Sequence, residues 1–160
     1  MKKLTILLLM CFPVFSQEYK VPPEVIKSLI EADPQPIISF NDDGSLGLVL
    51  NSDGYQSIDD LAKDELRVAG TRLDPVRYTS SRMRYYKSFS LLETKTGEEI
   101  EVEYPENGKF SFFQWSPNEE KIAFTNTTNS GVELWVIDVN SRKSSKVIET
   151  HVNDILNSPY

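Results

Sequence analysis

The sequence has 160 residues, of which 39% are hydrophobic and 26% are charged, and its formal net charge is −7 at pH 7. These proportions are ordinary for a globular protein and exclude an intrinsically disordered chain, which would be less hydrophobic. The acidic balance disfavours nucleic acids and anionic membranes as partners, because both are bound through positively charged protein surfaces.

The first 16 residues have the pattern of a cleavable export signal. Lys2 and Lys3 give a positive start, and an apolar stretch over residues 4–15 follows. Ser16 is a small residue suited to cleavage before Gln17. The apolar stretch is shorter than the roughly twenty residues that a membrane-spanning helix needs. We therefore expect export to the periplasm or to the outside of the cell, with no membrane attachment once the signal is removed.

The only cysteine of the sequence, Cys11, belongs to that signal. A lipid anchor at Cys11 is the less favoured alternative, because bulky Met10 stands where such sites have a small residue. Cleavage would leave a chain without disulfides or thiolate chemistry. The sequence contains neither a cluster of cysteine and histidine nor a phosphate-binding glycine loop, so we expect no metal and no other cofactor.

Residues 17–36 predict a short helical segment between prolines. Pro22-Pro23 favours a helix start, because proline is tolerated in the first helical turn. Asp33-Pro34 favours its end, because the residue before a proline avoids helical backbone angles. These signals place a helix of about two turns at residues 24–32.

Residues 37–103 predict a first unit of antiparallel strands. A polar turn at residues 41–45 leads into the alternating apolar strand of residues 46–50. A helix is expected to interrupt this unit at residues 57–66. Ser57 is a suitable helix cap, acidic residues follow in the first turn, and apolar residues recur at helical spacing.

Residues 104–150 carry the clearest pattern, which is a second unit of four strands. One strand ends at Trp115, and the others are expected at residues 121–125, 132–139 and 146–149. The turns between them are rich in Gly, Pro, Asn and Ser. Strands of this length and spacing predict an all-β sheet.

The first unit repeats the layout of the second, and repeated four-stranded units are typical of a β-propeller. A propeller ring closes with roughly four to eight such blades, whereas this chain supplies about two. We therefore expect an all-β, partial β-propeller with one inserted helix, in which residues 151–160 begin a linker to a missing blade. Free strands at the edges of an open sheet pair readily with other chains, so edge-strand pairing with a partner is also expected.

The sequence offers no complete set of catalytic residues. A hydrolase nucleophile elbow reads Gly-x-Ser-x-Gly, and the nearest match, at residues 44–47, has the wrong spacing. His151 is the only histidine, and we expect a solvated loop residue, because a catalytic base needs a nucleophile placed beside it. Asn126-Thr127-Thr128 is a glycosylation sequon, for which an ordinary polar turn is the favoured interpretation.

A series of short motifs carries a resemblance to a known family. In chain order they are Val21-Pro22-Pro23-Glu24, Pro34-Gln35-Pro36, Ser39-Phe40, Asp60-Leu61-Ala62, the string ELRVAGTRLDP at residues 65–75, Ser81-Arg82, Trp115-Ser116-Pro117 and Ile122-Ala123-Phe124. Together they resemble the amino-terminal propeller region of prolyl oligopeptidase-family serine peptidases, in the glutamyl endopeptidase-like branch. The resemblance spans nearly the whole chain after the export signal, and the string at residues 65–75 is its most specific part.

The resemblance implies a propeller that sits over a carboxy-terminal α/β-hydrolase domain and limits access to its Ser-Asp-His triad. We expect that domain to be missing from this chain, so no catalytic residue is carried over. The chain alone is then expected to be inactive as a peptidase. Peptide substrates would be its partners only through the catalytic domain.

Four arginines lie close together after the expected helix: Arg72, Arg77, Arg82 and Arg84. Guanidinium groups bind carboxylates in a two-pronged geometry, so these are candidate substrate-binding residues for acidic side chains of a peptide. This role would suit the glutamate preference that the resemblance implies. The competing interpretation is that the arginines pair on a solvated strand with nearby acids such as Asp74 or Glu93 and bind no substrate.

Two classes of function follow. In the first, the chain is the amino-terminal part of an exported serine peptidase, and it gates and orients peptide substrates for the catalytic domain. In the second, it is a non-catalytic binding module derived from a propeller, which completes its sheet by pairing with a partner. We favour the first class.

Overall fold

A computed structural model of the chain describes residues 20–156 and 158–160. The expected export signal and its cleavage site at Ser16 and Gln17 lie outside the described residues. The chain divides into two compact units, residues 1–31 and residues 32–160, and each is described by itself. Within the described part of the chain, neither helix is long and apolar enough to cross a membrane.

The described part of the first unit contains the helix α1 (Glu24–Glu31). Its first hydrogen bonds run from the backbone N–H groups of Ile26 and Lys27 to the carbonyl of Pro23, at 2.9 and 3.0 Å. Because proline lacks an N–H but still offers a carbonyl, it is well suited to this position. The proline signals of the sequence therefore predicted the start of this helix correctly.

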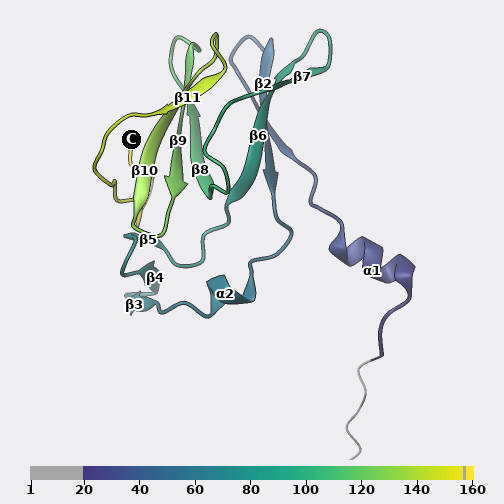
Figure 1. Ribbon diagram of the computed structural model, residues 1–160, viewed down its shortest axis with the longest axis vertical. Coiled ribbons are helices and arrows are strands. Elements are labelled where there is room, and N and C mark those ends of the chain that lie inside the picture. Colours follow the sequence, from purple (N-terminus) through teal and green to yellow (C-terminus); the bar gives the residue numbers. More distant parts are fainter. Residues whose placement is uncertain (1–19, 157) are drawn as a thin grey trace, which may run out of the picture. The chain divides into compact units, whose positions relative to one another are not determined.

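The second unit consists mostly of strands (Figure 1). In chain order its elements are β1 (Ile37–Phe40), β2 (Leu46–Ser52), α2 (Ile58–Leu61), β3 (Leu66–Val68), β4 (Thr71–Asp74), β5 (Thr79–Ser80), β6 (Tyr86–Glu93), β7 (Glu98–Glu101), β8 (Phe110–Trp115), β9 (Lys121–Thr127), β10 (Val132–Asp138) and β11 (Lys143–Lys146). Every pairing between these strands is antiparallel, and neither sheet closes on itself. The expectation of a mostly β, antiparallel chain is confirmed.

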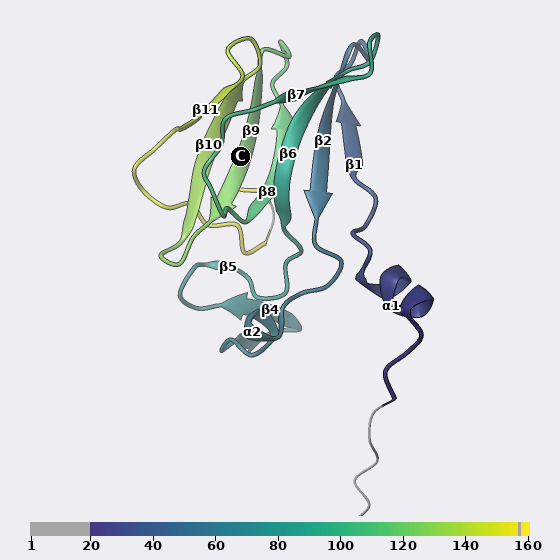
Figure 2. The same cartoon turned by 45° about the vertical axis from the view of Figure 1, so that its right-hand side comes forward.

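The large sheet has two halves of four strands each. Its order is β1-β2-β6-β8-β9-β10-β11, and β7 pairs with β6 off this path. The β6 residues that pair with β7 also pair with β2, so β7 lies along the opposite edge of β6 from β2. A single residue pair, Tyr86 with Phe110, joins β6 to β8. We call β1, β2, β6 and β7 the first sheet half and β8 to β11 the second sheet half. Figure 2 shows the strands of the two halves running alongside each other.

The hydrophobic core lies between the two sheet halves. Leu48 and Phe89 from the first half and Phe110 and Phe124 from the second are all buried in one cluster. The ring of Phe89 contacts those of Phe110 and Phe124 edge to face, each with centroids 5.2 Å apart. Aromatic rings prefer this geometry and bury a large apolar area, so the cluster stabilises the packing of one half on the other.

The connection from β2 to β6, residues 53–85, differs from the sequence expectation. We call it the insertion. The helix predicted at residues 57–66 is wrong in length, because α2 covers only Ile58–Leu61 and Leu66 already belongs to β3. Leu66 pairs with Leu73 in a small three-stranded sheet of order β3-β4-β5. Pairing with a strand farther along the chain therefore overrides the helical spacing of the apolar residues.

The outer strand of the second sheet half also lies earlier than predicted. β11 covers Lys143–Lys146, not residues 146–149. The turn that precedes it is tight, because the Asp138 carboxylate accepts a 2.8 Å hydrogen bond from the backbone N–H of Ser141. Arg142 adopts a φ of 60°, which reverses the chain one residue before the strand starts. The sequence pattern missed this side-chain bond and placed the turn too late.

Candidate functional site

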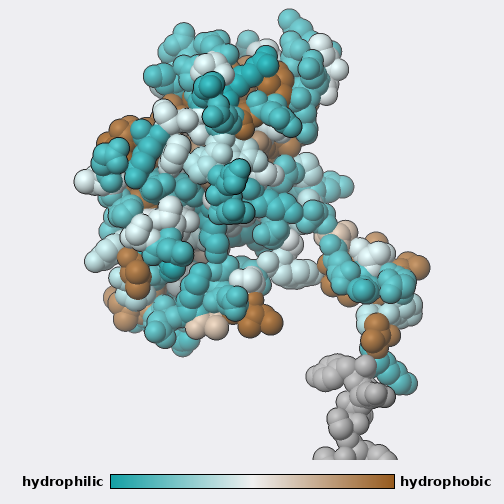
Figure 3. Space-filling view, viewed as in Figure 1, coloured by the Kyte–Doolittle hydropathy of each residue, from teal (hydrophilic) through white to brown (hydrophobic). Residues whose placement is uncertain are grey.

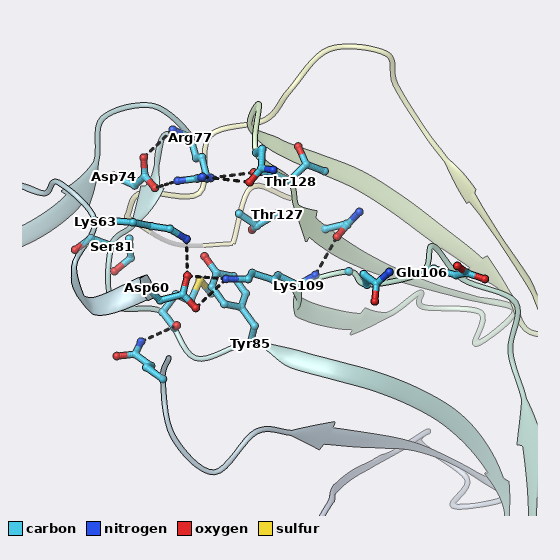
Figure 4. Close-up of a pocket in the computed structure, with 17 residues that line it drawn as sticks. Asp60, Lys63, Asp74, Arg77, Ser81, Tyr85, Glu106, Lys109, Thr127 and Thr128 are labelled. Carbon is cyan, nitrogen blue, oxygen red and sulfur yellow. Dashed lines mark hydrogen bonds and ion pairs between the residues drawn. The ribbon is translucent and has the colours of Figure 1, made fainter. Parts of the chain in front are cut away.

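A cavity of about 290 Å³ lies between the insertion and the second sheet half (Figure 4). The insertion contributes side chains from α2 and from the β4–β5 region. The opposite wall comes from residues 106–109, which lead into β8, and from residues 126–129, which end β9 and begin its connection to β10. Because these segments lie far apart in the sequence, the cavity forms only when the insertion folds against the large sheet.

One carboxylate in this cavity is shared by two lysines. Lys109 Nζ lies 2.7 and 2.9 Å from the two carboxylate oxygens of Asp60, and Lys63 Nζ lies 2.5 Å from one of them. Hydrogen bonds from Lys109 and then Lys63 hold the pKa of Asp60 well below its usual range. The Ser57 hydroxyl caps α2 by accepting from the Asp60 N–H at 3.0 Å, which fixes the position of this carboxylate. Two ammonium groups on one carboxylate leave one positive charge in excess.

A second ion pair fastens the insertion to the β9–β10 loop. Arg77 Nη1 lies 2.6 Å from Asp74 Oδ2, and the backbone N–H groups of Val76 and Arg77 donate to Asp74 Oδ1 at 2.9 and 3.0 Å. Burial alone would raise the pKa of Asp74, but the bonds from Arg77 and Val76 lower it below its ordinary value. Arg77 Nε also donates to the Thr128 carbonyl at 3.0 Å. Figure 4 shows Arg77 reaching from the insertion to that loop.

The sequon residue Asn126 forms part of the cavity wall and is only 5% exposed. Its side-chain oxygen accepts from the backbone N–H of Lys109 at 3.2 Å, and its side-chain nitrogen donates to Glu133 at 3.3 Å. A glycan would have to be attached to that nitrogen. In this folded state the amide is engaged and enclosed. The expected turn is wrong in position, because Asn126 and Thr127 still belong to β9 and only Thr128 follows the strand.

Two of the four candidate arginines are engaged by the same acid. Arg72 and Arg82 both form ion pairs with Glu65, the latter at 3.3 Å. Arg67, at 2.9 Å, and the Ser81 hydroxyl, at 3.1 Å, reach the same carboxylate. Burial would raise the pKa of Glu65, but the bonds from Arg67, Ser81 and Arg72 lower it to about 2. Arg72 and Arg82 therefore hold the insertion together and do not line the cavity.

The other two candidate arginines lie elsewhere. Arg77 lines the cavity, but Asp74 neutralises its charge. Arg84 lines an adjoining cavity of about 140 Å³, together with Tyr85 and Lys87. None of the ion pairs found in residues 20–156 and 158–160 involves Arg84. The structure thus distributes the four arginines over three places and brings only Arg72 and Arg82 together.

Sequence reasoning missed the residues that form the cavity. Asp60 and Lys109 are 49 positions apart, and no local pattern connects them. The only available signal was the spacing of Ser57 and Asp60, which is typical of a helix cap and suggests no ligand.

His151 lies near a serine hydroxyl. Its Nε2 is 3.3 Å from Ser130 Oγ, and its ring packs against Gly131. Both side chains are exposed, and within the described residues no hydrogen bond to the other ring nitrogen is found. A catalytic base is normally oriented by a third group, so this pair lacks the arrangement of a catalytic dyad.

Comparisons with known proteins point to peptidases. The chain is 30% identical over 154 residues to a probable chloroplastic glutamyl endopeptidase of Oryza sativa subsp. japonica, covering 88% of this chain and 16% of that protein. It is 30% identical over 131 residues to a probable chloroplastic glutamyl endopeptidase of Arabidopsis thaliana, covering 76% of this chain and 14% of that protein. No protein-family model and no solved structure matches the chain. The similarity supports a peptidase-related origin, and the chain spans less than a fifth of the length of these relatives.

Proposed function

We propose that this chain is an amino-terminal, non-catalytic part of a serine peptidase of the prolyl oligopeptidase family, in the glutamyl endopeptidase-like branch. The observation that carries the proposal is the 30% identity to a probable glutamyl endopeptidase over 88% of this chain. Similarity along most of the chain is more specific than the fold, because β-rich architectures host many unrelated functions. The activity itself is assigned to a catalytic domain elsewhere in a longer protein.

The two sheet halves are proposed to be consecutive blades of a β-propeller. Each half has four antiparallel strands in chain order, and the two share one core, as neighbouring blades do. Apolar side chains of β1 are exposed on the first half: Ile37 at 56%, Ile38 at 39% and Phe40 at 53%. Further blades of a complete ring would cover such surfaces. Residues 37–103 and 104–150 would be the two blades, with residues 151–160 leading into the next.

The cavity beside the insertion is the proposed place of contact with peptide substrates. Figure 3 shows a mostly hydrophilic face over the second unit, as expected for a solvent-exposed surface. The cationic residues that line the two adjoining cavities are Lys63, Arg77, Arg84, Lys87 and Lys109. Of the four candidate arginines, Arg84 is the one placed to meet an acidic side chain, because Arg72, Arg77 and Arg82 already pair with acids.

The protein is proposed to act outside the cytoplasm, on the basis of the export signal in its first 16 residues. In this location the part of the protein given by residues 17–160 would present no cysteine to an oxidising environment, since Cys11 would be removed with the signal.

The substrate role is tested by charge reversal in the full-length peptidase that contains this chain. Arg84→Glu is expected to lower the preference for glutamate over neutral substrates, measured as the ratio of the two kcat/KM values. Lys95→Glu, at an exposed turn residue outside both cavities, is the matched control for the change in charge. An unchanged ratio in the Arg84→Glu enzyme would contradict the proposed contact.

A non-catalytic binding module is the second candidate, and the free edge of β1 favours it. Among the strands that the structure describes, β1 pairs only with β2, so its other edge offers unpaired backbone groups next to exposed apolar side chains. A module of this kind would bind an extended strand at that edge. Concentration-dependent association of the purified chain that is abolished by Ile38→Pro would support this function, because proline removes a backbone donor from the edge.

A further inference from the structure

Asp154 is a buried carboxyl group without a counter-charge. It is 2% exposed, and neither of its carboxyl oxygens receives a hydrogen bond from the described residues. Most buried carboxylates in proteins are paired or hydrogen-bonded, because an ionised group loses several kcal/mol of hydration on burial, as an order of magnitude. The position of Asp154 is therefore much better suited to the neutral acid than to the carboxylate.

The groups around Asp154 offset the effect of burial on its ionisation only in part. Thr79, at the start of β5, is 1% exposed and places a neutral hydroxyl beside the carboxyl group. Tyr85 is a neighbour whose own pKa is raised by burial and, to a smaller extent, by the charge of Asp154. On the insertion, Asp74 and Arg77 neutralise one another. Burial accordingly raises the pKa of Asp154 above its ordinary value of 3.8, and the Thr79 hydroxyl lowers it only in part.

His151 is the remaining titratable group on the same segment. Its ring is directed to Ser130 and Gly131 in the β9–β10 loop, where Nε2 lies 3.3 Å from Ser130 Oγ. The effects on the Asp154 pKa come from burial, from Thr79 and from its own backbone, and none comes from His151.

Asp154 lies at the junction of three parts of the second unit. Its backbone N–H donates to the Tyr78 carbonyl of the insertion at 3.3 Å. Two residues earlier, the N–H of Val152 donates to the Val132 carbonyl of β10 at 2.8 Å. We call residues 151–156 the C-terminal segment. It therefore ties the insertion to the second sheet half, and the cavity lies between those same two parts.

Within the described residues, three contacts tie the insertion to the second sheet half and to the C-terminal segment. Arg77 reaches the Thr128 carbonyl and the Asn129 side chain, Lys109 reaches Asp60, and the C-terminal segment reaches Tyr78. The first two contacts are made by charged side chains. The third contact is a long hydrogen bond of 3.3 Å. Its donor is the backbone N–H of Asp154, whose own side chain is buried. A change in the charge of Asp154 would act on this contact.

We propose that Asp154 is a proton-controlled latch: its neutral form holds the C-terminal segment against the insertion, and its ionisation loosens that contact and widens the cavity. The sign follows from the direction of the pKa change. An acid whose pKa is raised on folding contributes stability that is complete below its unfolded pKa and is lost as the pH rises through its folded pKa. The latch is closed in acid and open at higher pH. Its consequence for peptide substrates rests on the proposed function, whereas the latch itself does not.

The test uses the whole chain and follows backbone hydrogen exchange from about pH 4 to about pH 8, corrected for the intrinsic effect of pH. In the wild-type protein, protection of the amides at residues 78–81 and 152–155 should fall about tenfold for each unit by which the pKa is raised. Asp154→Asn keeps the shape of the neutral acid and should hold protection constant over this range. Asp64→Asn, at an exposed carboxylate of the same insertion, should leave the wild-type pH dependence unchanged.

A second measurement reads the carboxyl group directly. The ¹³C shift of the Asp154 carboxyl carbon should titrate above 3.8, its ordinary value. An Asp154 that titrates at or below 3.8, or an Asp154→Asn protein with the wild-type pH dependence, overturns the proposal. Calcium, magnesium or sodium ions that restore protection at high pH in the wild type but not in Asp154→Asn would also overturn it, because the carboxylate would then be paired with a cation.

Discussion

The carboxylate of Glu119 accepts a 2.6 Å hydrogen bond from the backbone N–H of Asp42, 77 residues away in the sequence. Glu119 lies in the turn between β8 and β9, and Asp42 lies in the turn between β1 and β2. The second carboxylate oxygen accepts from Asn41 Nδ2 at 3.0 Å. The two turns occupy equivalent places in the two sheet halves, so this one side chain fastens the halves together at their ends, outside the hydrophobic core.

Replacing Glu119 with Gln should weaken that connection. The variant keeps the size of the side chain but loses the charge that strengthens both bonds, so the free energy of unfolding should fall by about 1 kcal/mol. Urea unfolding of the purified chain gives this value. Glu99→Gln, at an exposed position of β7, is the control and should change stability by less than half as much. Equal stabilities of the two variants would show that the turns do not hold the halves together.

The core between the halves should depend strongly on Phe89. This ring contacts Phe110, Phe113 and Phe124, all of which belong to the second half. Phe89→Ala should cost about 3–5 kcal/mol, because it removes these contacts and leaves a cavity. Phe40→Ala, at a side chain that is 53% exposed, should cost much less. Thermal unfolding followed by near-ultraviolet circular dichroism compares the two, and a similar loss in both would contradict the assigned core.

The insertion should be sensitive to acid through Glu65. Its pKa falls from 4.5 to about 2 on folding, so it contributes stability that is complete above 4.5 and is lost as the pH falls towards about 2. Protection of the β3–β5 amides against hydrogen exchange should decline over that window. Glu65→Gln should be less protected at neutral pH and should show little further decline in acid. A decline in the variant as steep as that in the wild type would assign the effect to other carboxylates.

Asn126 should carry no glycan even where the cell can attach one. The side chain is enclosed and engaged by Lys109 and Glu133 in the folded protein. Expression in an exporting host that glycosylates proteins should therefore give a single mass without sugar. Thr128→Ala removes the sequon but keeps the backbone carbonyl that binds Arg77. A glycosidase-sensitive species in the wild type that is absent from Thr128→Ala would show that Asn126 is accessible before folding.

The sequence predicted those parts of the fold that local patterns determine. Strands β9 and β10 follow directly from short apolar runs between turns, and the start of α1 follows from Pro22-Pro23. The helix at residues 57–66 was predicted too long, because Leu66 pairs with Leu73 by contacts that the helical pattern does not contain. Local spacing cannot show which of two competing structures the rest of the chain will stabilise.

The candidate site was less predictable than the fold. The four arginines form a cluster in the sequence, which suggested a binding site for carboxylates. Three of them instead pair with Glu65 or Asp74 in the same insertion. The cavity depends on Asp60 meeting Lys109 and on Arg77 meeting Thr128, which are contacts between distant segments. No sequence pattern singles out Asp154, since only its burial in the folded chain distinguishes it from the other acidic residues.

The proposed origin in a serine peptidase is tested most directly by labelling the native protein. A fluorophosphonate probe, which reacts with active serine hydrolases, is applied to the exported fraction of cells that make this chain, and labelled proteins are identified by mass spectrometry. We predict that peptides from residues 113–142 occur in a labelled species several hundred residues long. If these peptides occur only in an unlabelled species of no more than 160 residues, the account is contradicted and the chain is a binding module in its own right.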